Sequence, residues 1–527
     1  MQVSASTPSN PTASGPVSSQ RLARGDFVGL GVALGVACWL AFANLGAQAL
    51  WQDEAQSALL SRTTLEHGIP LGSDGLNFFS QEMGVEYDDA HRWRWHTWLH
   101  FYLVAGSFAL FGESTAAARV PAALLGVATL LGVFALAWTW WRDRVAAHAA
   151  VLSLLGLVPF WILVRQCRYY SLTACFAVFA LLGYARFAQG RRSGVWIYAA
   201  SVVALFHSHY VYVPPLLAAV LWHCWVFDRI RFRALGKATA LALAVCAPWI
   251  VWQSGMDYPA TYIDELGDPG YWLRKGGLFT RKLLAHGSGL ALLTGAVVVA
   301  AGIAVREGAG KLRALARDRG AMGLCGVGLA IGATLSIVAP DAFFRYLTPL
   351  LPLLALAFGG LVAQAMRVHA AAALALLVGV FALQPLVRFG HELRHDFEGP
   401  IEGLVTYLAE NVEPDDSVWI TYGDMPLKFY LKVRVVGGLT GESLEEALAS
   451  TPPDWVVLRR HTVSASRDGA VRAFIEREVD LAHFRKVELP FTDTRFENRE
   501  EPAEHRFRSA RGGPPVTLYA RRRRGHD

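Results

Sequence analysis

Long apolar segments recur through about the first 390 residues of this chain, and they constrain its fold more than any other feature. The hydrocarbon core of a bilayer is about 30 Å thick, so an α-helix needs roughly 20 apolar residues to cross it. With 53% hydrophobic and 17% charged residues, the composition excludes an ordinary soluble protein. We predict a mostly α, polytopic transmembrane bundle of about 11–13 spans. The twelve candidate spans are residues 27–50, 97–112, 120–140, 145–164, 170–187, 195–208, 209–227, 237–253, 288–305, 321–339, 345–366 and 369–388.

The basic segments between spans predict the topology. Positive charges cluster at residues 186–192, 229–237 and 306–319, and the positive-inside rule places such segments in the cytoplasm. With a cytoplasmic N-terminus the segment that holds Asp53 is external, yet counting onward places the first basic segment outside as well. The list of spans therefore misses or miscounts one crossing between residues 97 and 188. If the basic segments are given more weight than this list, the chain has 13 spans and its C-terminal part is external. We expect a multi-pass protein of the cell inner (plasma) membrane.

The chain divides into three parts by composition. Residues 1–25, rich in Ser, Thr and Pro, are expected to form a disordered cytoplasmic N-terminus. Residues 26–390 are expected to form the transmembrane module, with larger external loops at residues 51–96 and 254–287. Residues 392–527 lack long apolar runs and are expected to form a soluble domain.

Strands and helices alternate in this last part, which predicts a small α/β extracytoplasmic domain. The predicted helices are Ile401–Asn411, Pro426–Leu431 and Glu442–Ala449, and the predicted strands are Ser417–Tyr422, Val433–Val436 and Trp455–Leu458. The sequence of this part has no Gly-rich phosphate loop and no evident nucleophile, so we interpret it as a lid or an acceptor-docking domain. A spacer that points away from the site is the alternative.

Two adjacent carboxylates, Asp53 and Glu54, follow the first span directly. They are either the start of a solvated loop or a catalytic acid pair at the bilayer surface. Because adjacent residues point in different directions, we expect one carboxylate to act as a base and the other to orient a group. Residues 54–67 predict an amphipathic helix along the membrane interface, with Ala55 and Leu59 on its apolar face.

A second acidic and aromatic cluster lies at residues 86–96, before the next span. The side chains in and beside it that suit a divalent metal, as weak candidates, are Asp88, Asp89, His91, His96 and His100. A polar, Trp-rich entry to the span is the alternative, so the sequence specifies no cofactor with certainty and leaves a divalent metal as an option. Arg94 is a stronger candidate for a phosphate contact, because a planar guanidinium matches phosphate oxygens.

Further polar side chains lie at span junctions, and each has a structural and a functional interpretation. Arginines at span ends often just extend to the interface, and a histidine in an apolar region is usually a satisfied core residue. Two histidines, His207 and His209, beside Tyr210 at a break between spans indicate a polar cavity instead. The candidate substrate-binding residues are Arg94, His96, Arg165, Arg168, Tyr170, His209, Tyr210, Arg345 and Tyr346.

Short motifs follow one another in a fixed order over residues 51–352. They are Trp51-x-Asp53-Glu54-Ala55 with Glu66-His67-Gly68-x-Pro70, Arg119-Val120-Pro121-Ala122-Ala123-Leu124-x-Gly126, Arg168-x-Tyr170-x-Leu172, His209-Tyr210, and Arg345-Tyr346-x-x-Pro349-x-x-Pro352. Each motif is weak alone. In this order they resemble the GT-C superfamily of polytopic glycosyltransferases, most closely the branch that holds the protein O-mannosyltransferases and the bacterial lipid A aminoarabinose and Rgt-type transferases.

The resemblance implies an enzyme that uses a polyprenyl-phosphate-linked sugar outside the cytoplasm. By motif, the family's catalytic acid in the first external loop corresponds to Asp53, with Glu54 beside it. Family arginines or lysines near the membrane surface hold the carrier phosphate, and the candidates for that role here are Arg94, Arg165, Arg168 and Arg345. The family's proline pair before the second span is absent, which leaves the sugar identity open.

We therefore predict an inverting membrane glycosyltransferase for hexosyl or pentosyl transfer, with Asp53 as base, a polyprenyl-phosphate-linked sugar as donor and a lipid, glycan or protein as acceptor. Phosphate is a good leaving group, so one base and cationic stabilisation are sufficient chemistry. The net charge of +6 lies in short loops and the C-terminus and suits lipid rather than nucleic acid. The alternative function is a non-enzymatic lipid-linked-sugar transporter or flippase, or an envelope assembly component.

Overall fold

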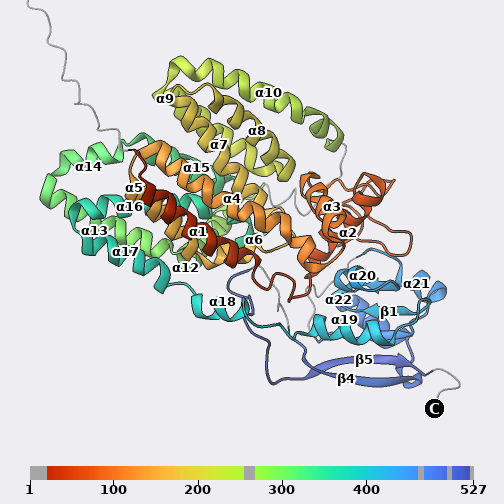
Figure 1. Ribbon diagram of the computed structural model, residues 1–527. Helices are drawn as coiled ribbons and strands as arrows, with labels where there is room; N and C mark the ends of the chain where they lie inside the picture. Colours follow the sequence, from red (N-terminus) through yellow and green to blue (C-terminus); the bar gives the residue numbers. More distant parts are fainter. Residues whose placement is uncertain (1–20, 255–266, 439, 461–467, 495–500, 523–527) are drawn as a thin grey trace, which may run out of the picture.

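The computed structural model describes residues 21–254, 267–438, 440–460, 468–494 and 501–522. Among these residues, eight helices are long and apolar enough to cross a membrane: α1 (Arg24–Phe42), α4 (Thr115–Trp141), α7 (Tyr170–Ala188), α9 (Val213–Phe227, continuing the short η1, Tyr210–Tyr212), α10 (Arg229–Gln253), α13 (Gly289–Glu307), α15 (Arg319–Val338) and α16 (Leu350–Val368). They pack into the bundle in the upper part of Figure 1. The mostly α transmembrane fold is confirmed.

The remaining apolar segments form bent or shorter helices. Two bent pairs are candidate spans: α5 (Arg144–Gly156) with α6 (Val158–Val164), at 69°, and α17 (Ala370–Ala382) with α18 (Leu386–Glu392), at 48°. The shorter apolar helices are α3 (Leu99–Phe111) and α8 (Ser193–Ser208). Each of the twelve predicted segments therefore contains a helix, although α1 ends at Phe42, well before the predicted Leu50.

The basic segments gather at one end of this bundle. Trp141, at the end of α4, donates to Asp318 before α15 (3.2 Å), and Arg142 donates to Gln189 after α7 (3.1 Å). At the opposite end, the guanidinium of Arg165, after α6, donates to carbonyl oxygens at the end of α1. The bundle thus has a basic end and an end that carries the α1–α2 linker, residues 43–51.

Helix α3 begins and ends at this second end, so the expectation that residues 97–112 cross the membrane is wrong. Before α3, the ring of Trp98 packs on Trp252 near the end of α10, with centroids 5.2 Å apart. After it, the Oγ1 of Thr115 lies 2.7 Å from the hydroxyl of Tyr430. A 13-residue helix is also short for a span. Counting α8 together with the eight long helices and the two bent pairs gives eleven candidate crossings in the described part of the chain, within the expected range of about 11–13. This odd number agrees with the basic segments once residues 97–112 are not counted as a span.

Glycines allow α7 and α8 to pack with their backbones in contact. A Cβ added to Gly183 would lie 2.4 Å from the backbone nitrogen of Tyr198, and one added to Gly194 would lie 2.4 Å from that of Phe187. Small residues at such crossings are typical of membrane helices, where close van der Waals contact drives association. This contact fixes the short α8 beside α7 and so positions the break that holds His209.

A five-stranded mixed sheet follows the bundle, in the lower right of Figure 1. Its order is β2-β1-β3-β5-β4, with β1 parallel to β2 and β3, and β5 antiparallel to β3 and β4. The elements of this region are α19 (Pro400–Asn411), β1 (Ser417–Ile420), α20 (Asp424–Tyr430), β2 (Arg434–Gly437), α21 (Leu444–Ser450), β3 (Trp455–Val457), α22 (Asp468–Glu478), η3 (Leu481–His483), β4 (Phe484–Thr492) and β5 (Pro515–Arg521). All six predicted elements occur, and α22, β4 and β5 were not predicted.

Alternation along β1 gives the sheet two buried faces. Val418 and Ile420 pack with Leu404 of α19 and Leu427 of α20, whereas Trp419 packs with residues of α21 and α22 on the other face. Strands buried on both faces are typical of parallel α/β sheets. Helix α20 lies between this sheet and the bundle, where it contacts α2 (Gln52–His67).

Three further elements lie outside the spans: α12 (Pro269–His286), α14 (Ala309–Ala316) and the 3-10 turn η2 (Phe344–Leu347). Part of the expected loop 254–287 is thus the helix α12, and residues 255–266 lie outside the described part. Helix α2 forms where residues 54–67 predicted a helix. It is enclosed by protein up to Thr64, however, so it does not lie open along the interface as expected.

Candidate functional site

Asp53 occupies the first turn of α2, directly after the linker from the first span. The amino end of a helix carries partial positive charge, which favours a carboxylate there. Its side chain keeps 20% of its surface exposed, so water reaches it. Asp53 therefore has the access that a group acting on a substrate requires.

Two guanidinium groups flank this carboxylate. Nη2 of Arg168 lies 3.7 Å and Nη1 of Arg345 lies 3.8 Å from the same oxygen, Oδ2 of Asp53. Arg168 comes from the turn between α6 and α7, and its Nη1 also donates to the Oγ of Ser57 (2.9 Å). Arg345 comes from η2, near the other end of the bundle's sequence. The fold thus converges one acid and two cations from three distant segments.

Glu54, the neighbour of Asp53, is fully buried. Its two oxygens accept from Nε (2.8 Å) and Nη2 (2.6 Å) of Arg119, and one also accepts from the N–H of Cys167 (2.5 Å). The exposed fractions of the two side chains are 0% for Glu54 and 4% for Arg119. A buried charge needs such complete pairing. Of the two carboxylates, Glu54 ties α2 to α4 and to the α6–α7 turn, and only Asp53 faces accessible space.

Neutral aromatic rings surround Arg168. Tyr169 lies under its guanidinium at 5.2 Å from the ring centroid, and the rings of His209 and His96 lie 4.5 Å and 5.1 Å from Tyr169. Burial, reinforced by the charge of Arg168, lowers the pKa of His209 to about 3. Burial also lowers the pKa of His96 well below its ordinary range, again with Arg168 contributing. Both imidazoles are therefore neutral at pH 7, and Arg168 supplies the positive charge there.

Tyrosine side chains, three of them predicted from the sequence, continue the group of aromatic rings around Arg168. The hydroxyl of Tyr212 donates to the carbonyl of Tyr346 (3.0 Å), and Arg345 lies over the ring of Tyr346 at 5.5 Å. Tyr170 is fully buried beside Arg168, and Tyr210 accepts from Gln253 (3.0 Å) at the end of α10. The predicted residues that gather around Asp53 and Arg168 are His96, Tyr170, His209, Arg345 and Tyr346, with Tyr210 next to His209.

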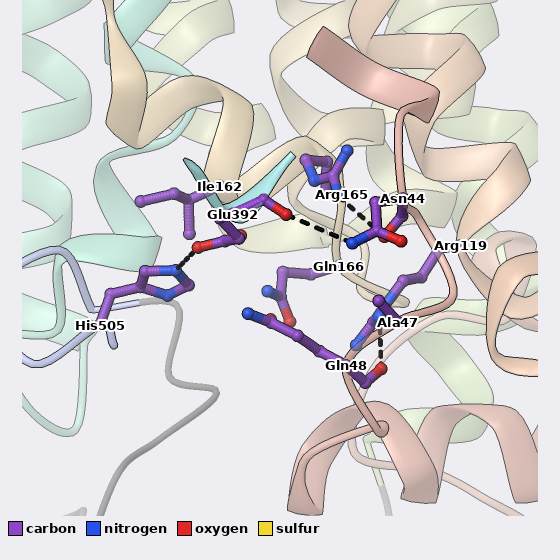
Figure 2. A pocket seen from close by; sticks show the side chains of 9 residues that line it. All are labelled: Asn44, Ala47, Gln48, Arg119, Ile162, Arg165, Gln166, Glu392 and His505. Atoms are coloured by element: carbon purple, nitrogen blue, oxygen red, sulfur yellow. Dashed lines mark hydrogen bonds and ion pairs between the residues drawn. The ribbon is translucent and has the colours of Figure 1, made fainter. Parts of the chain in front are cut away.

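Two predicted arginines have other partners. Arg94 donates to the carbonyl of Trp252 (2.7 Å) and lies over that residue's ring. Arg165 caps the carboxyl end of α1 by donating to the carbonyls of Leu40, Ala41 and Ala43. Figure 2 shows Arg165 in a polar pocket lined also by Arg119, Gln48, Gln166, Glu392 and His505. Neither arginine is placed at Asp53, so Arg168 and Arg345 are the candidates that the geometry selects.

The acidic cluster before α3 is not assembled as a metal site. Asp88 instead accepts from the backbone N–H groups of Ala90 and Arg92 and pairs with the Arg92 side chain (2.7 Å). His91 packs against Phe78, whereas His96 packs against Trp93. Over the described ranges, no group of three or more His, Cys, Asp or Glu side chains is placed to hold a metal ion.

Sequence reasoning placed Arg119 in a motif but missed its role. The signal was present, because Arg119 is a charged residue in the apolar segment that became α4, and such residues usually have a dedicated partner. Ser57 and Gln166 were also missed. Gln166 accepts from the indole N–H of Trp51 (2.6 Å) and so fixes the residue two before Asp53. Single polar residues of this kind carry no distinctive pattern in sequence.

Known proteins share this arrangement of helices. The family model described as dolichyl-phosphate-mannose-protein mannosyltransferase matches residues 95–252, which include α4, Arg168 and His209. The crystal structure of ArnT from Cupriavidus metallidurans bound to undecaprenyl phosphate is similar over 94% of this chain and 98% of that one, with a TM-score of 0.56 at 16% identity. The chain therefore shares the fold of the GT-C glycosyltransferases, and part of it matches a family model of that group. A search of curated proteins by sequence gives no match.

Two other GT-C structures support the same fold. Arabinofuranosyltransferase AftD from mycobacteria matches with a TM-score of 0.53 at 16% identity, over 97% of this chain and 40% of its own. The archaeal oligosaccharyltransferase AglB from Archaeoglobus fulgidus, in complex with an inhibitory peptide and a dolichol-phosphate, matches with a TM-score of 0.54 at 11% identity, over 90% and 75%. At identities this low, the similarity shows a GT-C fold for this chain and leaves its activity and substrates to be argued from the site.

Proposed function

We propose that this GT-C protein transfers a sugar from a polyprenyl-phosphate donor to an acceptor hydroxyl, with Asp53 as the general base. The observation that carries the proposal is the placement of Asp53 Oδ2 at 3.7 Å and 3.8 Å from Arg168 and Arg345. A base must remove a proton from the attacking hydroxyl while negative charge develops on the departing phosphate. The partly exposed carboxylate can accept the proton, and the two arginines beside it can stabilise the negative charge on the phosphate.

The arginines suit the carrier phosphate. Guanidinium groups form paired hydrogen bonds with phosphate oxygens, and both side chains are mostly buried, with 11% of their surface exposed. A phosphate that binds these two arginines shares the charge that now faces the Asp53 carboxylate, which leaves Asp53 available as a base. ArnT is bound to undecaprenyl phosphate in its crystal structure and AglB is in complex with a dolichol-phosphate, and both support a polyprenyl-phosphate carrier for this chain.

A single displacement follows from one base. The acceptor oxygen attacks the anomeric carbon as the bond from that carbon to the phosphate oxygen breaks, and Asp53 takes the hydroxyl proton. Attack opposite the leaving group inverts the anomeric configuration. Glu54 is held by Arg119 and positions α2, so it offers no second nucleophile for a retaining route.

We further propose that the site faces the extracytoplasmic side. The support is the positive-inside rule, because the basic segments lie at the end of the bundle opposite Asp53. The C-terminal domain shares the end that holds Asp53, since the hydroxyl of Tyr430 accepts from the N–H of Leu50 (2.9 Å). With α8 counted as a crossing, the number of candidate crossings is odd, which puts the start of α1 and this domain on opposite faces.

The test is the Asp53→Asn variant, purified in detergent and returned to vesicles that contain envelope acceptors. Release of undecaprenyl phosphate from undecaprenyl-phosphate hexose and pentose donors is measured. We expect transfer to fall by about 10²–10⁴-fold, the usual contribution of a general base, with normal folding. Unchanged transfer by Asp53→Asn would remove the proposed base. Transport of the donor across the vesicle without transfer by the native chain would favour a flippase instead.

A further inference from the structure

The linker before Asp53 is held from two sides. Its carbonyl oxygens at Leu45, Gln48 and Ala49 accept from the guanidinium of Arg119 in the bundle. The N–H groups of Ala49 and Leu50 instead donate to side chains of the C-terminal domain. Ala49 therefore accepts from the bundle with its carbonyl and donates to the domain with its amide.

The domain supplies three hydrogen-bond acceptors to this segment. Oε1 of Glu402 in α19 accepts from the N–H of Ala49 (2.8 Å), and the hydroxyl of Tyr430 in α20 accepts from the N–H of Leu50 (2.9 Å). Oδ1 of Asp424, also in α20, accepts from the side-chain amide of Gln52 (2.7 Å). These three bonds cover the residues that lead directly into Asp53.

The anchor at Asp424 is itself rigid. Its other oxygen, Oδ2, pairs with Lys428 at 2.8 Å, and the exposed fractions of these side chains are 1% and 0%. Lys428 also donates to the carbonyl of Phe78 (2.8 Å), in the loop after α2. A lysine buried this completely needs all of its hydrogen-bond partners, so these contacts fix the position of α20 against the loop after α2.

The domain makes a second attachment, at the arginine on the other side of the site. Oε2 of Glu501 accepts from the N–H of Phe344 (2.7 Å), the residue directly before Arg345. The other carboxylate oxygen of Glu501 lies 2.6 Å from the Nζ of Lys282 on α12. The Glu501 side chain is only 6% exposed, so this ion pair is shielded from solvent.

We propose that the C-terminal domain is a two-point scaffold that sets the spacing between Asp53 and Arg345, with Tyr430 and Glu501 as positioning residues. The two site residues come from segments far apart in sequence, and each follows a backbone N–H that donates to a side chain of this domain: Leu50 lies three residues before Asp53, and Phe344 lies directly before Arg345. The domain is therefore part of the site's framework, in addition to any role as a cover. Neither positioning residue touches the reacting atoms, and each acts through the backbone that it holds.

The test uses the full chain in detergent and two measurements. Hydrogen exchange by mass spectrometry reports the peptides that contain Leu50 and Phe344, and undecaprenyl phosphate alone is the probe for carrier binding. In Glu501→Ala we expect exchange at Phe344 to accelerate and the Kd for undecaprenyl phosphate to rise about tenfold, as for a lost hydrogen bond to a charged acceptor. Glu501→Gln keeps an oxygen acceptor for Phe344 and should restore both values even though the ion pair with Lys282 is lost.

Glu504→Ala is the matched control, because Glu504 is an exposed glutamate in the same segment and its loss should change neither value. If Glu501→Ala does not fold, Tyr430→Phe tests the first attachment, with faster exchange expected at Leu50 and a lower kcat at nearly unchanged KM. Native carrier affinity in Glu501→Ala, or no rescue by Glu501→Gln, would overturn the scaffold. The binding arm rests on the proposed function, and the exchange arm does not. A native chain that fails to bind the carrier would therefore refute the function, while accelerated exchange at Phe344, rescued by Gln, would still support the scaffold.

Discussion

Glu54 and Arg119 form a bidentate ion pair in which neither side chain has appreciable access to water, with the shorter contact at 2.6 Å. The pair joins the first turn of α2 to α4, so the residue next to the proposed base cannot shift without breaking a buried charge pair. Adjacent carboxylates thus take opposite roles: Glu54 fixes the helix, and Asp53 faces the site.

Removing Arg119 should therefore destabilise the whole protein. We expect Arg119→Met to lower the free energy of unfolding by about 3–5 kcal/mol, because it leaves the Glu54 charge buried and unpaired. Glu488→Gln is the matched control, since the Lys486–Glu488 pair has the same 2.6 Å contact but both side chains are more than half exposed. That change should alter stability by less than about 1 kcal/mol. Denaturation in detergent measures both, and equal effects would contradict the assignment of Glu54 as structural.

The two site arginines should control affinity for the lipid carrier. We expect Arg168→Ala and Arg345→Ala each to raise the Kd for undecaprenyl phosphate by about 10- to 100-fold, the range for a lost hydrogen bond to a charged group. Arg94→Ala should have a much smaller effect, because that guanidinium is bound to the carbonyl of Trp252. Binding can be followed by native mass spectrometry. An Arg94 effect as large as that of Arg345 would place the phosphate elsewhere.

Stability should fall as the pH is lowered below neutrality, in part through His209. Burial and the charge of Arg168 lower its native pKa to about 3, whereas an unfolded histidine titrates near 6.5. The unfolded chain therefore takes up a proton first, so the stabilising contribution is full above about pH 6.5 and declines toward pH 3, by up to about 1.4 kcal/mol per pH unit. His209→Gln should flatten the change in Tm between pH 7.5 and 5. His483→Gln, at an exposed position, should leave the profile as in the native chain.

The close approach of α7 and α8 should not tolerate a larger side chain. We expect Gly183→Val to lower Tm by many degrees or to prevent folding, because its Cβ would lie 2.4 Å from the backbone nitrogen of Tyr198. Gly35→Val, in α1, is the control, since no atom lies within 4 Å of a Cβ added there. Thermal unfolding in detergent compares the two. If the Gly183→Val protein were as stable as the Gly35→Val protein, α7 and α8 could move apart without a loss of stability.

The sequence by itself determined the membrane fold and most of its elements. Apolar runs mark the helices because a bilayer accepts only segments that satisfy their own backbone hydrogen bonds, so each of the twelve runs became helical. Alternation of strand and helix signals likewise located α19 to β3. Asp53 became a candidate because an acidic pair follows the first apolar run, and the motif order supplied the resemblance to a family.

Only the tertiary structure decided which polar residues meet. Composition cannot distinguish α3, which begins and ends at the same end of the bundle, from the counted crossing α8, because both are short apolar helices of 13 and 16 residues. The helices packed around each of them set its path. In the same way Arg94, Arg165, Arg168 and Arg345 look equivalent at span junctions, and the fold brings only the last two within 4 Å of Asp53. The contacts that fix Asp53 and Arg345 join segments hundreds of residues apart, and such pairings arise from packing rather than from any local pattern.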